Sequence, residues 1–216
     1  MRKIVASSSA GIYGELRTMP IQREPSLDPP DALWRLQAVH GKAMPAYAAT
    51  HGIEAVALRY FNVYGPNQRF DAYGNVIPIF VFNALQGRPI TIFGDGRQTR
   101  DFVNVADVVQ ANIKAAMATG VSGAFNVASA TQTCILELAG AIRDGLGIPV
   151  EIEFGPLRAG DVEHSLADIE AASAAPGYRP QGRWTSGCPT PARGGGRGPG
   201  LPRRPGGRGG VGETPP

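Results

Sequence analysis

Two short apolar runs with a helical stretch between them constrain the fold of this chain more than any other feature. Residues 3–6 and 54–61 have the length and composition of buried strands, and residues 35–50 between them are rich in Ala, Leu and Gln. We expect polar loops to follow the strands, at Ser7-Ser8-Ser9 and at Asn62. A strand, a crossover helix and a second strand form a βαβ unit, which requires a parallel sheet.

The same alternation of helix and strand continues downstream. Asn104 is placed to cap the start of a helix, and Asp107 would lie in that helix's first turn. The pattern predicts helices over 76–86, 105–118, 135–146 and 166–174, and strands over 90–93, 124–127 and 150–154. The expected fold class is therefore α/β.

The basic character of the chain belongs to its last 28 residues. The net charge is +3 and the pI is about 9.1, but residues 189–216 hold ten Gly, seven Pro and five Arg against one acidic residue. We expect residues 181–216 to be a disordered Gly/Pro/Arg tail, because so much Gly and Pro cannot form a helix or a central strand. Segments such as Arg208-Gly209-Gly210 resemble RNA-binding sequences. The rest of the chain is near neutral, however, so we do not expect nucleic acid as a partner.

Other classes of protein and site are disfavoured by what the sequence does not contain. No run approaches eighteen apolar residues and the amino terminus has no signal-like apolar region, so we expect a cytoplasmic protein without a membrane partner. No His or Cys residues stand at metal-ligand spacing, and no metal site is expected.

Five motifs resemble those of one enzyme family. They are Ser7-Ser8-Ser9-Ala10-x-x-Tyr13-Gly14, Arg59-Tyr60-Phe61-Asn62-Val63-Tyr64-Gly65-Pro66, Asn75-Val76-Ile77-Pro78, the run from Ile92-Phe93-Gly94-Asp95-Gly96 to Arg100-Asp101-Phe102-Val103, and Arg158-x-Gly160-Asp161. In this order and spacing they resemble the NAD-dependent nucleotide-sugar epimerases and dehydratases of the extended short-chain dehydrogenase/reductase family. The resemblance covers residues 3–180. It implies the C-terminal part of a Rossmann-like doubly wound parallel sheet with a small α/β substrate-binding domain.

The resemblance also implies a role for each motif residue. Ser9 would be catalytic, with its hydroxyl bonded to the hydroxyl at the reacting sugar carbon, and Ser7 and Tyr60 would contact the nicotinamide half of NAD. A UDP-sugar or related nucleotide-sugar would be the partner, held by Asn62, Asn75, Ile92, Phe93, Arg100, Arg158 and Asp161. Guanidinium groups suit this task because they bind phosphate oxygens in pairs. Without the family context, Arg100 beside Asp101 could instead form a surface ion pair.

The residues after Ser9 bear on the type of reaction. Sugar 4,6-dehydratases use an Asp-Glu pair there, since eliminating water requires an acid and a base. This chain has Ala10 and Gly11, which transfer no proton, so epimerisation at the sugar C4 is favoured. A reductase or dehydratase of the same family, a non-enzymatic nucleotide-sugar binder and an RNA-binding protein stay open as alternatives.

Two features that the family requires are missing from these 216 residues. The glycine-rich loop for the pyrophosphate would precede the first strand, so the resemblance implies that residues 1–66 are a remnant of the NAD-binding domain. Residues 67–180 would be the substrate-binding part with returning Rossmann elements. The tyrosine of the family's Tyr-x-x-x-Lys pair should lie near position 33 or 34. The chain has Leu33 and Trp34 there, and the pair is absent.

A local frameshift over residues 28–46 would explain the missing pair. One permitted codon choice for residues 31–42, read one base later, encodes Thr-Pro-Tyr-Gly-Val-Ser-Lys, which contains the motif at the expected place. A second frameshift near Gly182 would explain the tail, since Gly, Pro and Arg codons dominate out-of-frame reading of a GC-rich gene. On this hypothesis the chain is truncated and inactive. Family members often form homodimers through the helix of that pair, so this chain's oligomeric state stays open.

Overall fold

The computed structural model describes residues 2–13, 19–21, 44, 46, 48–70, 75–158 and 161–182. Of the helix expected over 35–50, only residues 44, 46 and 48–50 fall in these ranges, and all of them are helical. The frameshift hypothesis for residues 28–46 and the disordered tail expected over 181–216 lie almost wholly outside the described residues. Only Gln181 and Gly182 of that tail are described, and their backbone N–H groups donate to the Asp107 carboxylate, so the expectation of disorder is wrong for these two residues.

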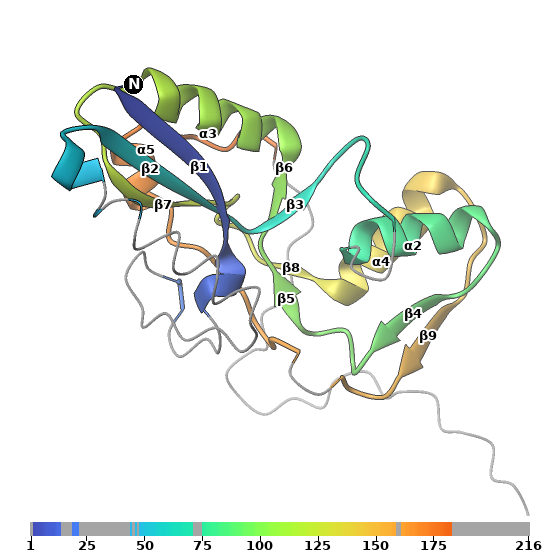
Figure 1. The fold of residues 1–216 in the computed structure, drawn as a ribbon. Coiled ribbons are helices and arrows are strands. Elements are labelled where there is room, and N and C mark those ends of the chain that lie inside the picture. Colours follow the sequence, from blue (N-terminus) through green and yellow to red (C-terminus); the bar gives the residue numbers. More distant parts are fainter. Residues whose placement is uncertain are drawn as a thin grey trace, which may run out of the picture.

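A three-stranded parallel sheet forms one lobe of the molecule (Figure 1). Its order is β1 (Lys3–Ser9), β2 (Glu54–Tyr60) and β7 (Gly123–Val127), with Lys3 opposite Glu54 and Ser9 opposite Tyr60. The polar loop expected at Ser7-Ser8-Ser9 is therefore wrong. The three serines continue β1 because their backbone pairs with residues 58–60 of β2, whatever the polarity of their side chains.

Helix α3 (Val105–Met117) lies on this sheet and begins where the sequence predicts. The Asn104 side chain accepts a hydrogen bond from the backbone N–H of Ala106 and so caps the helix. The core between α3 and the sheet contains Val56, Leu58, Val103, Val108, Ala111, Ala115, Phe125, Val127, Ala172 and Tyr178. The Tyr178 hydroxyl donates to the Ala128 carbonyl at 2.7 Å, which anchors the segment after α5 (Glu170–Ala174) to the end of β7.

A second lobe pairs two helices with two short strands. Helix α2 (Val76–Leu85) and α4 (Ile135–Leu146) lie beside the parallel pair of β4 (Ile90–Phe93) and β9 (Ile152–Gly155) (Figure 1). The turn after β4 needs glycine at Gly96, where φ is +76° and a Cβ would lie 3.0 Å from Leu136 Cβ. The predicted bounds of the strand over 90–93 and of the helix over 135–146 are confirmed.

Short elements that the sequence did not predict connect the two lobes. Strand β3 (Asn62–Tyr64) pairs in parallel with β6 (Phe102–Asn104), so Asn62 begins a strand rather than a loop. Strand β5 (Thr99–Arg100) pairs in antiparallel fashion with β8 (Thr133–Cys134), and η1 (Ala10–Tyr13) is a 3₁₀ turn after β1. Strands of two or three residues are too short to show a hydrophobic period.

A buried carboxylate joins the connecting strands to two distant segments. Asp101 is completely buried, and its Oδ1 accepts hydrogen bonds from the backbone N–H and the hydroxyl of Ser129, both at 2.8 Å. Its Oδ2 accepts from the backbone N–H of Ala167 at 3.1 Å. That bond helps to explain why the helix predicted over 166–174 is confined to α5: the start of the segment is held in extended form, with Ala167 also bridged to Ile21.

None of the helices within the described ranges has the combination of length and hydropathy needed to cross a membrane.

We expect Asp101→Asn to destabilise the fold by about 1–3 kcal/mol at neutral pH. The side-chain NH2 of the asparagine would replace one acceptor oxygen of the aspartate and would face a backbone N–H donor. Burial raises the pKa of Asp101, and the hydrogen bonds from Ser129 and Ala167 oppose that shift only in part. A group whose folded-state pKa is raised contributes stability below its unfolded pKa and loses it as the pH rises through the folded pKa. The difference in unfolding free energy between wild type and variant should therefore narrow as the pH rises from about 4.

Urea unfolding followed by circular dichroism between pH 4 and pH 8 measures this difference. Asp168→Asn is the matched control, because Asp168 Oδ1 accepts from the Glu170 N–H and an Asn oxygen can do the same. If the difference in unfolding free energy between wild type and Asp101→Asn widened with pH, the raised pKa of Asp101 would be contradicted.

Candidate functional site

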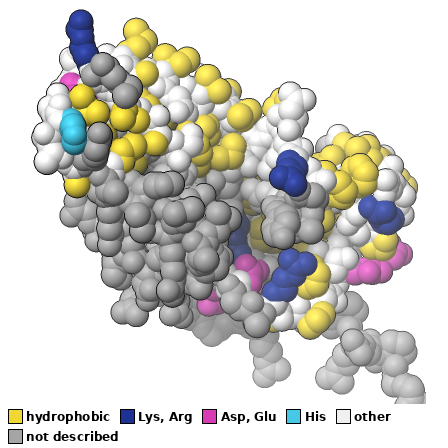
Figure 2. Space-filling model, viewed as in Figure 1, with side chains coloured by type: hydrophobic (Ala, Val, Ile, Leu, Met, Phe, Trp, Pro, Cys, Tyr) yellow, Lys and Arg dark blue, Asp and Glu magenta, His cyan; other side chains and the backbone are white. Residues whose placement is uncertain are grey.

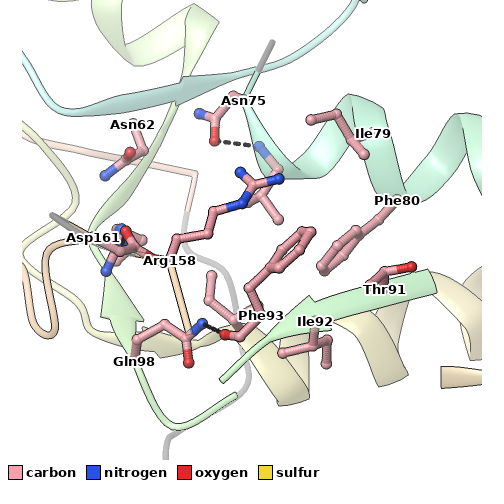
Figure 3. A pocket seen from close by; sticks show the side chains of 13 residues that line it. Asn62, Asn75, Ile79, Phe80, Thr91, Ile92, Phe93, Gln98, Arg158 and Asp161 are labelled. Atoms are coloured by element: carbon pink, nitrogen blue, oxygen red, sulfur yellow. Dashed lines mark hydrogen bonds and ion pairs between the residues drawn. The ribbon is translucent and has the colours of Figure 1, made fainter. Parts of the chain in front are cut away.

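A hollow of about 250 Å³ lies between the second lobe and the connecting strands β3 and β5. Figure 2 shows acidic and basic side chains side by side at this hollow. Its lining includes all seven residues that the sequence predicts for nucleotide-sugar binding. They come from separate elements and loops: Asn62, Asn75, Ile92, Phe93, Arg100, Arg158 and Asp161 (Figure 3).

Two of these residues hold one wall of the cavity in place. The Asn62 amide donates to the Asp101 carbonyl at 3.1 Å. Asn75 caps α2, since its Oδ1 accepts from the Val76 N–H at 2.7 Å. Val76 itself lines the cavity, so the N-terminus of α2 opens onto it. The Val76 N–H is already bonded and Pro78 has no N–H, so the helix dipole is what favours an anion at this point.

The second wall contains an ion pair. Arg100 Nη2 lies 2.5 Å from Asp161 Oδ1, and Arg100 Nη1 donates to the Thr99 carbonyl at 2.9 Å. Burial lowers the pKa of Arg100 and the Asp161 carboxylate opposes this shift; a guanidinium nevertheless stays charged at neutral pH. The alternative of a surface ion pair between Arg100 and Asp101 is wrong, because the two side chains have different partners and Asp101 is buried.

Arg158 approaches the cavity from the loop after β9. Its guanidinium carbon lies 3.7 Å from the centre of the Phe93 ring, a cation–π contact, and the side chain extends toward Asn75 (Figure 3). Among the residues that the structure describes, Arg158 has no carboxylate partner within ion-pair distance. Arg158 therefore provides a positive charge beside the N-terminus of α2 that no described acid neutralises.

The two predicted residues of β4 differ in their surroundings. Phe93 meets Arg158 in the cavity, whereas Ile92 is only 1% exposed and packs in the core between β4 and α4. Successive side chains of a strand point to opposite faces, so Phe93 presents more of its side chain to the cavity than Ile92 does. Thr91, which the prediction missed, lines the cavity too, and strand alternation from Phe93 could have identified it.

Gln98 is another lining residue that the prediction missed. Its amide donates to the Phe93 carbonyl at 2.7 Å and so ties β4 to the start of β5. The remaining wall is apolar and consists of Val76, Ile79, Phe80, Ile92 and Ile135. Apart from Ile92, which belongs to one of the five motifs, no pattern in the sequence separates these apolar residues from ordinary core residues.

A second cavity of about 240 Å³ adjoins the first and shares Asn62 and Arg100 with it. Ser9, Tyr60 and Ser165 line it together with Ala10, Gly11, Ile21, Phe61 and Val162. The Ser9 hydroxyl oxygen accepts from the Gly11 N–H at 3.2 Å, which leaves its own hydrogen available to a ligand. The structure thus brings Ser9 close to the residues of the first cavity.

The residues that the resemblance assigns to NAD, Ser7 and Tyr60, contact each other. Ser7 Oγ and the Tyr60 hydroxyl are 2.9 Å apart, and the Asn112 amide of α3 donates to the same hydroxyl at 2.8 Å. Asn112 is a further polar residue that no sequence pattern identifies, since it lies 52 positions from Tyr60. Within the described part of the chain, no group of three or more His, Cys, Asp or Glu side chains could hold a metal ion.

Comparisons with known proteins identify the family of this chain. Residues 1–128 match the family model described as the NAD dependent epimerase/dehydratase family. A UDP-glucose 4-epimerase of Mycolicibacterium smegmatis is 34% identical over 182 residues, which cover 84% of this chain and 58% of that protein. A dTDP-4-dehydro-6-deoxy-D-allose reductase of a Streptomyces species is 35% identical over 185 residues, covering 83% and 56% of the two chains.

A solved structure has the same fold. The UDP-N-acetylglucosamine 4-epimerase of Methanobrevibacter ruminantium M1, in complex with UDP-N-acetylmuramic acid, superimposes with a TM-score of 0.80 at 34% identity. The match covers 84% of this chain and 58% of that one. This chain spans less than two thirds of the length of each of these relatives. The family match over more than half of its residues nevertheless establishes that the chain belongs to the NAD dependent epimerase/dehydratase family.

Proposed function

We propose that the paired cavities bind a nucleotide-sugar, with the nucleoside diphosphate in the first cavity and the sugar in the second, beside Ser9. One observation carries the proposal. Residues chosen from four separated motifs converge on one hollow that combines positive charge with an apolar wall. A diphosphate needs the charge, and a base and ribose need a flat apolar surface with few polar groups.

The diphosphate is assigned to the space between Arg158 and the N-terminus of α2. Arg158 carries a charge that no described acid neutralises, and the helix end adds a partial positive charge beside it. Arg100 is held by Asp161 and the Thr99 carbonyl, so its guanidinium is positioned before a ligand arrives. Asp161 can also accept a hydrogen bond from a ribose hydroxyl.

The base is assigned to the surface formed by β4. Phe93 offers an aromatic ring, and the aliphatic wall of the cavity continues that surface. We assign UDP-sugars first, because the Mycolicibacterium relative is a UDP-glucose 4-epimerase and the solved Methanobrevibacter relative holds a UDP-linked sugar.

The reaction assigned to the family site is epimerisation at the sugar C4. Ser9 borders both the sugar cavity and the β1–β2 end where Ser7 and Tyr60 lie, so its hydroxyl can bond the reacting sugar hydroxyl. Ser7 and Tyr60 suit the nicotinamide end of NAD, which supplies hydride acceptance when bound. Ala10 and Gly11 border the sugar without an acid or base, which disfavours elimination of water.

A nucleotide-sugar reductase is the second candidate. The Streptomyces reductase is as similar to this chain as the epimerases are, and the absence of an acid–base pair after Ser9 suits reduction equally well.

The 216-residue chain itself should bind without turning over. Its sequence has no Tyr-x-x-x-Lys pair to supply a general base and the lysine that lowers its pKa. Tyr13, which has Arg17 four positions on, is 2% exposed and bonded to Arg59 and Asn126, so it is not available as a base.

We expect UDP to bind to the purified chain, and Arg158→Ala to weaken that binding about tenfold or more by removing a charge-assisted contact to phosphate. Isothermal titration calorimetry with UDP measures the affinity. Arg143→Ala is the control, since Arg143 lies on α4 beside Asp144 and away from the cavity lining. Equal losses in the two variants would refute the site.

Interconversion of UDP-glucose and UDP-galactose in the presence of NAD is expected to be undetectable with this chain, because the base is missing. The assay is run beside the intact Mycolicibacterium relative as a positive control. Measurable turnover by the 216 residues would overturn the expectation of inactivity and leave the binding proposal intact.

A further inference from the structure

The Phe93 ring, which is assigned to the base, is covered by another side chain of the same cavity. The guanidinium carbon of Arg158 lies 3.7 Å from the ring centre, so the two groups are in direct contact. On the partner strand, a Cβ at Gly155 would lie 3.2 Å from Cδ1 and 3.3 Å from Cε1 of the ring, so the ring also packs closely against the glycine backbone. A base cannot stack on the face that Arg158 covers while the guanidinium stays there.

The loop after β9 holds Arg158 over the end of β4. The Gly94 N–H donates to the Gly155 carbonyl at 3.0 Å and joins the two strands just before this loop. Leu157 packs against Gly94, where a Cβ would lie only 2.9 Å from Leu157 Cδ1. Arg158 is the next residue, so its side chain begins within reach of the Phe93 ring.

Little else fixes the Arg158 guanidinium on the ring. Arg158 is exposed, and within the described ranges its side chain has no ion pair and no hydrogen bond. Arg100, in contrast, is held by Asp161 and by the Thr99 carbonyl. An exposed cation–π contact changes an equilibrium constant by only about two- to fivefold. A stronger partner can therefore draw Arg158 away from the ring.

We propose that Arg158 moves from the Phe93 ring to the diphosphate when a nucleoside diphosphate binds, and that this movement uncovers the ring for the base. The proposal rests on the proposed function, because it assigns an exchange of contacts within the same nucleotide cavity. Phosphate oxygens bond a guanidinium in pairs, and such charge-assisted bonds are stronger than an exposed contact to a ring. The Arg158 side chain already extends toward Asn75 at the N-terminus of α2, where the diphosphate is assigned (Figure 3).

This exchange couples the two halves of the ligand. A nucleoside without phosphate must displace the guanidinium and offers it no new partner, whereas a diphosphate receives the guanidinium and leaves the ring open. Pyrophosphate should therefore strengthen the binding of a nucleoside, and the nucleoside should strengthen that of pyrophosphate by the same factor. The cavity would in this way favour whole nucleoside diphosphates over free nucleosides.

Uridine, which has the base but no phosphate, tests the exchange in the full chain. We expect Arg158→Ala to bind uridine about two- to fivefold more tightly than the wild type, although the same variant loses affinity for UDP. Saturating inorganic pyrophosphate should raise the uridine affinity of the wild type by a similar factor and leave that of Arg158→Ala unchanged. Saturation-transfer NMR measures uridine binding and calorimetry measures UDP binding. Because Arg158 is exposed, the variant should fold as the wild type does by circular dichroism.

Two further variants separate the uncovering of the ring from the loss of a positive charge. Arg88→Ala is the matched control, because the Arg88 guanidinium carbon lies 5.9 Å from the centre of the Phe82 ring and neither residue lines the two cavities. This variant should leave uridine and UDP binding unchanged. In a Phe93→Leu background, Arg158→Ala should no longer strengthen uridine binding, since no ring is left to uncover.

The results distinguish the exchange of contacts from the nucleotide site itself. If the wild type does not bind UDP, the site is refuted and the exchange with it. If UDP binds but Arg158→Ala leaves uridine affinity unchanged, lowers it or abolishes uridine binding, the site stands and the exchange is refuted. A lower uridine affinity would show that the base stacks on the guanidinium and not on the uncovered ring.

Discussion

The Asp101 carboxylate is the interaction on which the rest of the structure depends. It is completely buried and receives hydrogen bonds from Ser129 after β7 and from Ala167 before α5, so it holds three segments at one point. Removing these donors from a buried carboxylate would lower the stability of the fold by more than the loss of an ordinary hydrogen bond does. Because neighbouring side chains of an extended chain point in opposite directions, the burial of Asp101 turns Arg100 toward the cavities. One buried charge thus sets both the join between the lobes and the orientation of a site residue.

The site combines two kinds of surface that have separate origins. The charged side is built from loops and element ends: Arg158 after β9, Asp161 three residues later and the capped N-terminus of α2. The apolar side is the edge of the core between α2, β4 and α4. Together the two sides form a surface with contacts for both ends of a ligand. The shared residues Asn62 and Arg100 link it to the cavity of Ser9, so binding and reaction are assigned to adjacent spaces.

Sequence reasoning succeeded where a regular pattern extends over several residues. The helix from Val105 was predicted from its Asn104 cap, and β4 and α4 have the predicted bounds. It failed where a distant contact overrides a local preference. The three serines of β1 are drawn into the sheet by pairing with β2, and the first residues of the helix expected over 166–174 are held extended near Asp101 and Ile21.

The sequence by itself determined the α/β class, the family and the identity of the residues assigned to the ligand, because period, caps and motif spacing are properties of the chain alone. Only the tertiary structure decided that Arg100 pairs with Asp161 and not with Asp101, that Phe93 rather than Ile92 meets Arg158, and that Asn112 supports Tyr60. These facts depend on which face of an element is turned toward a partner tens of residues away, and such contacts leave no regular trace in the sequence.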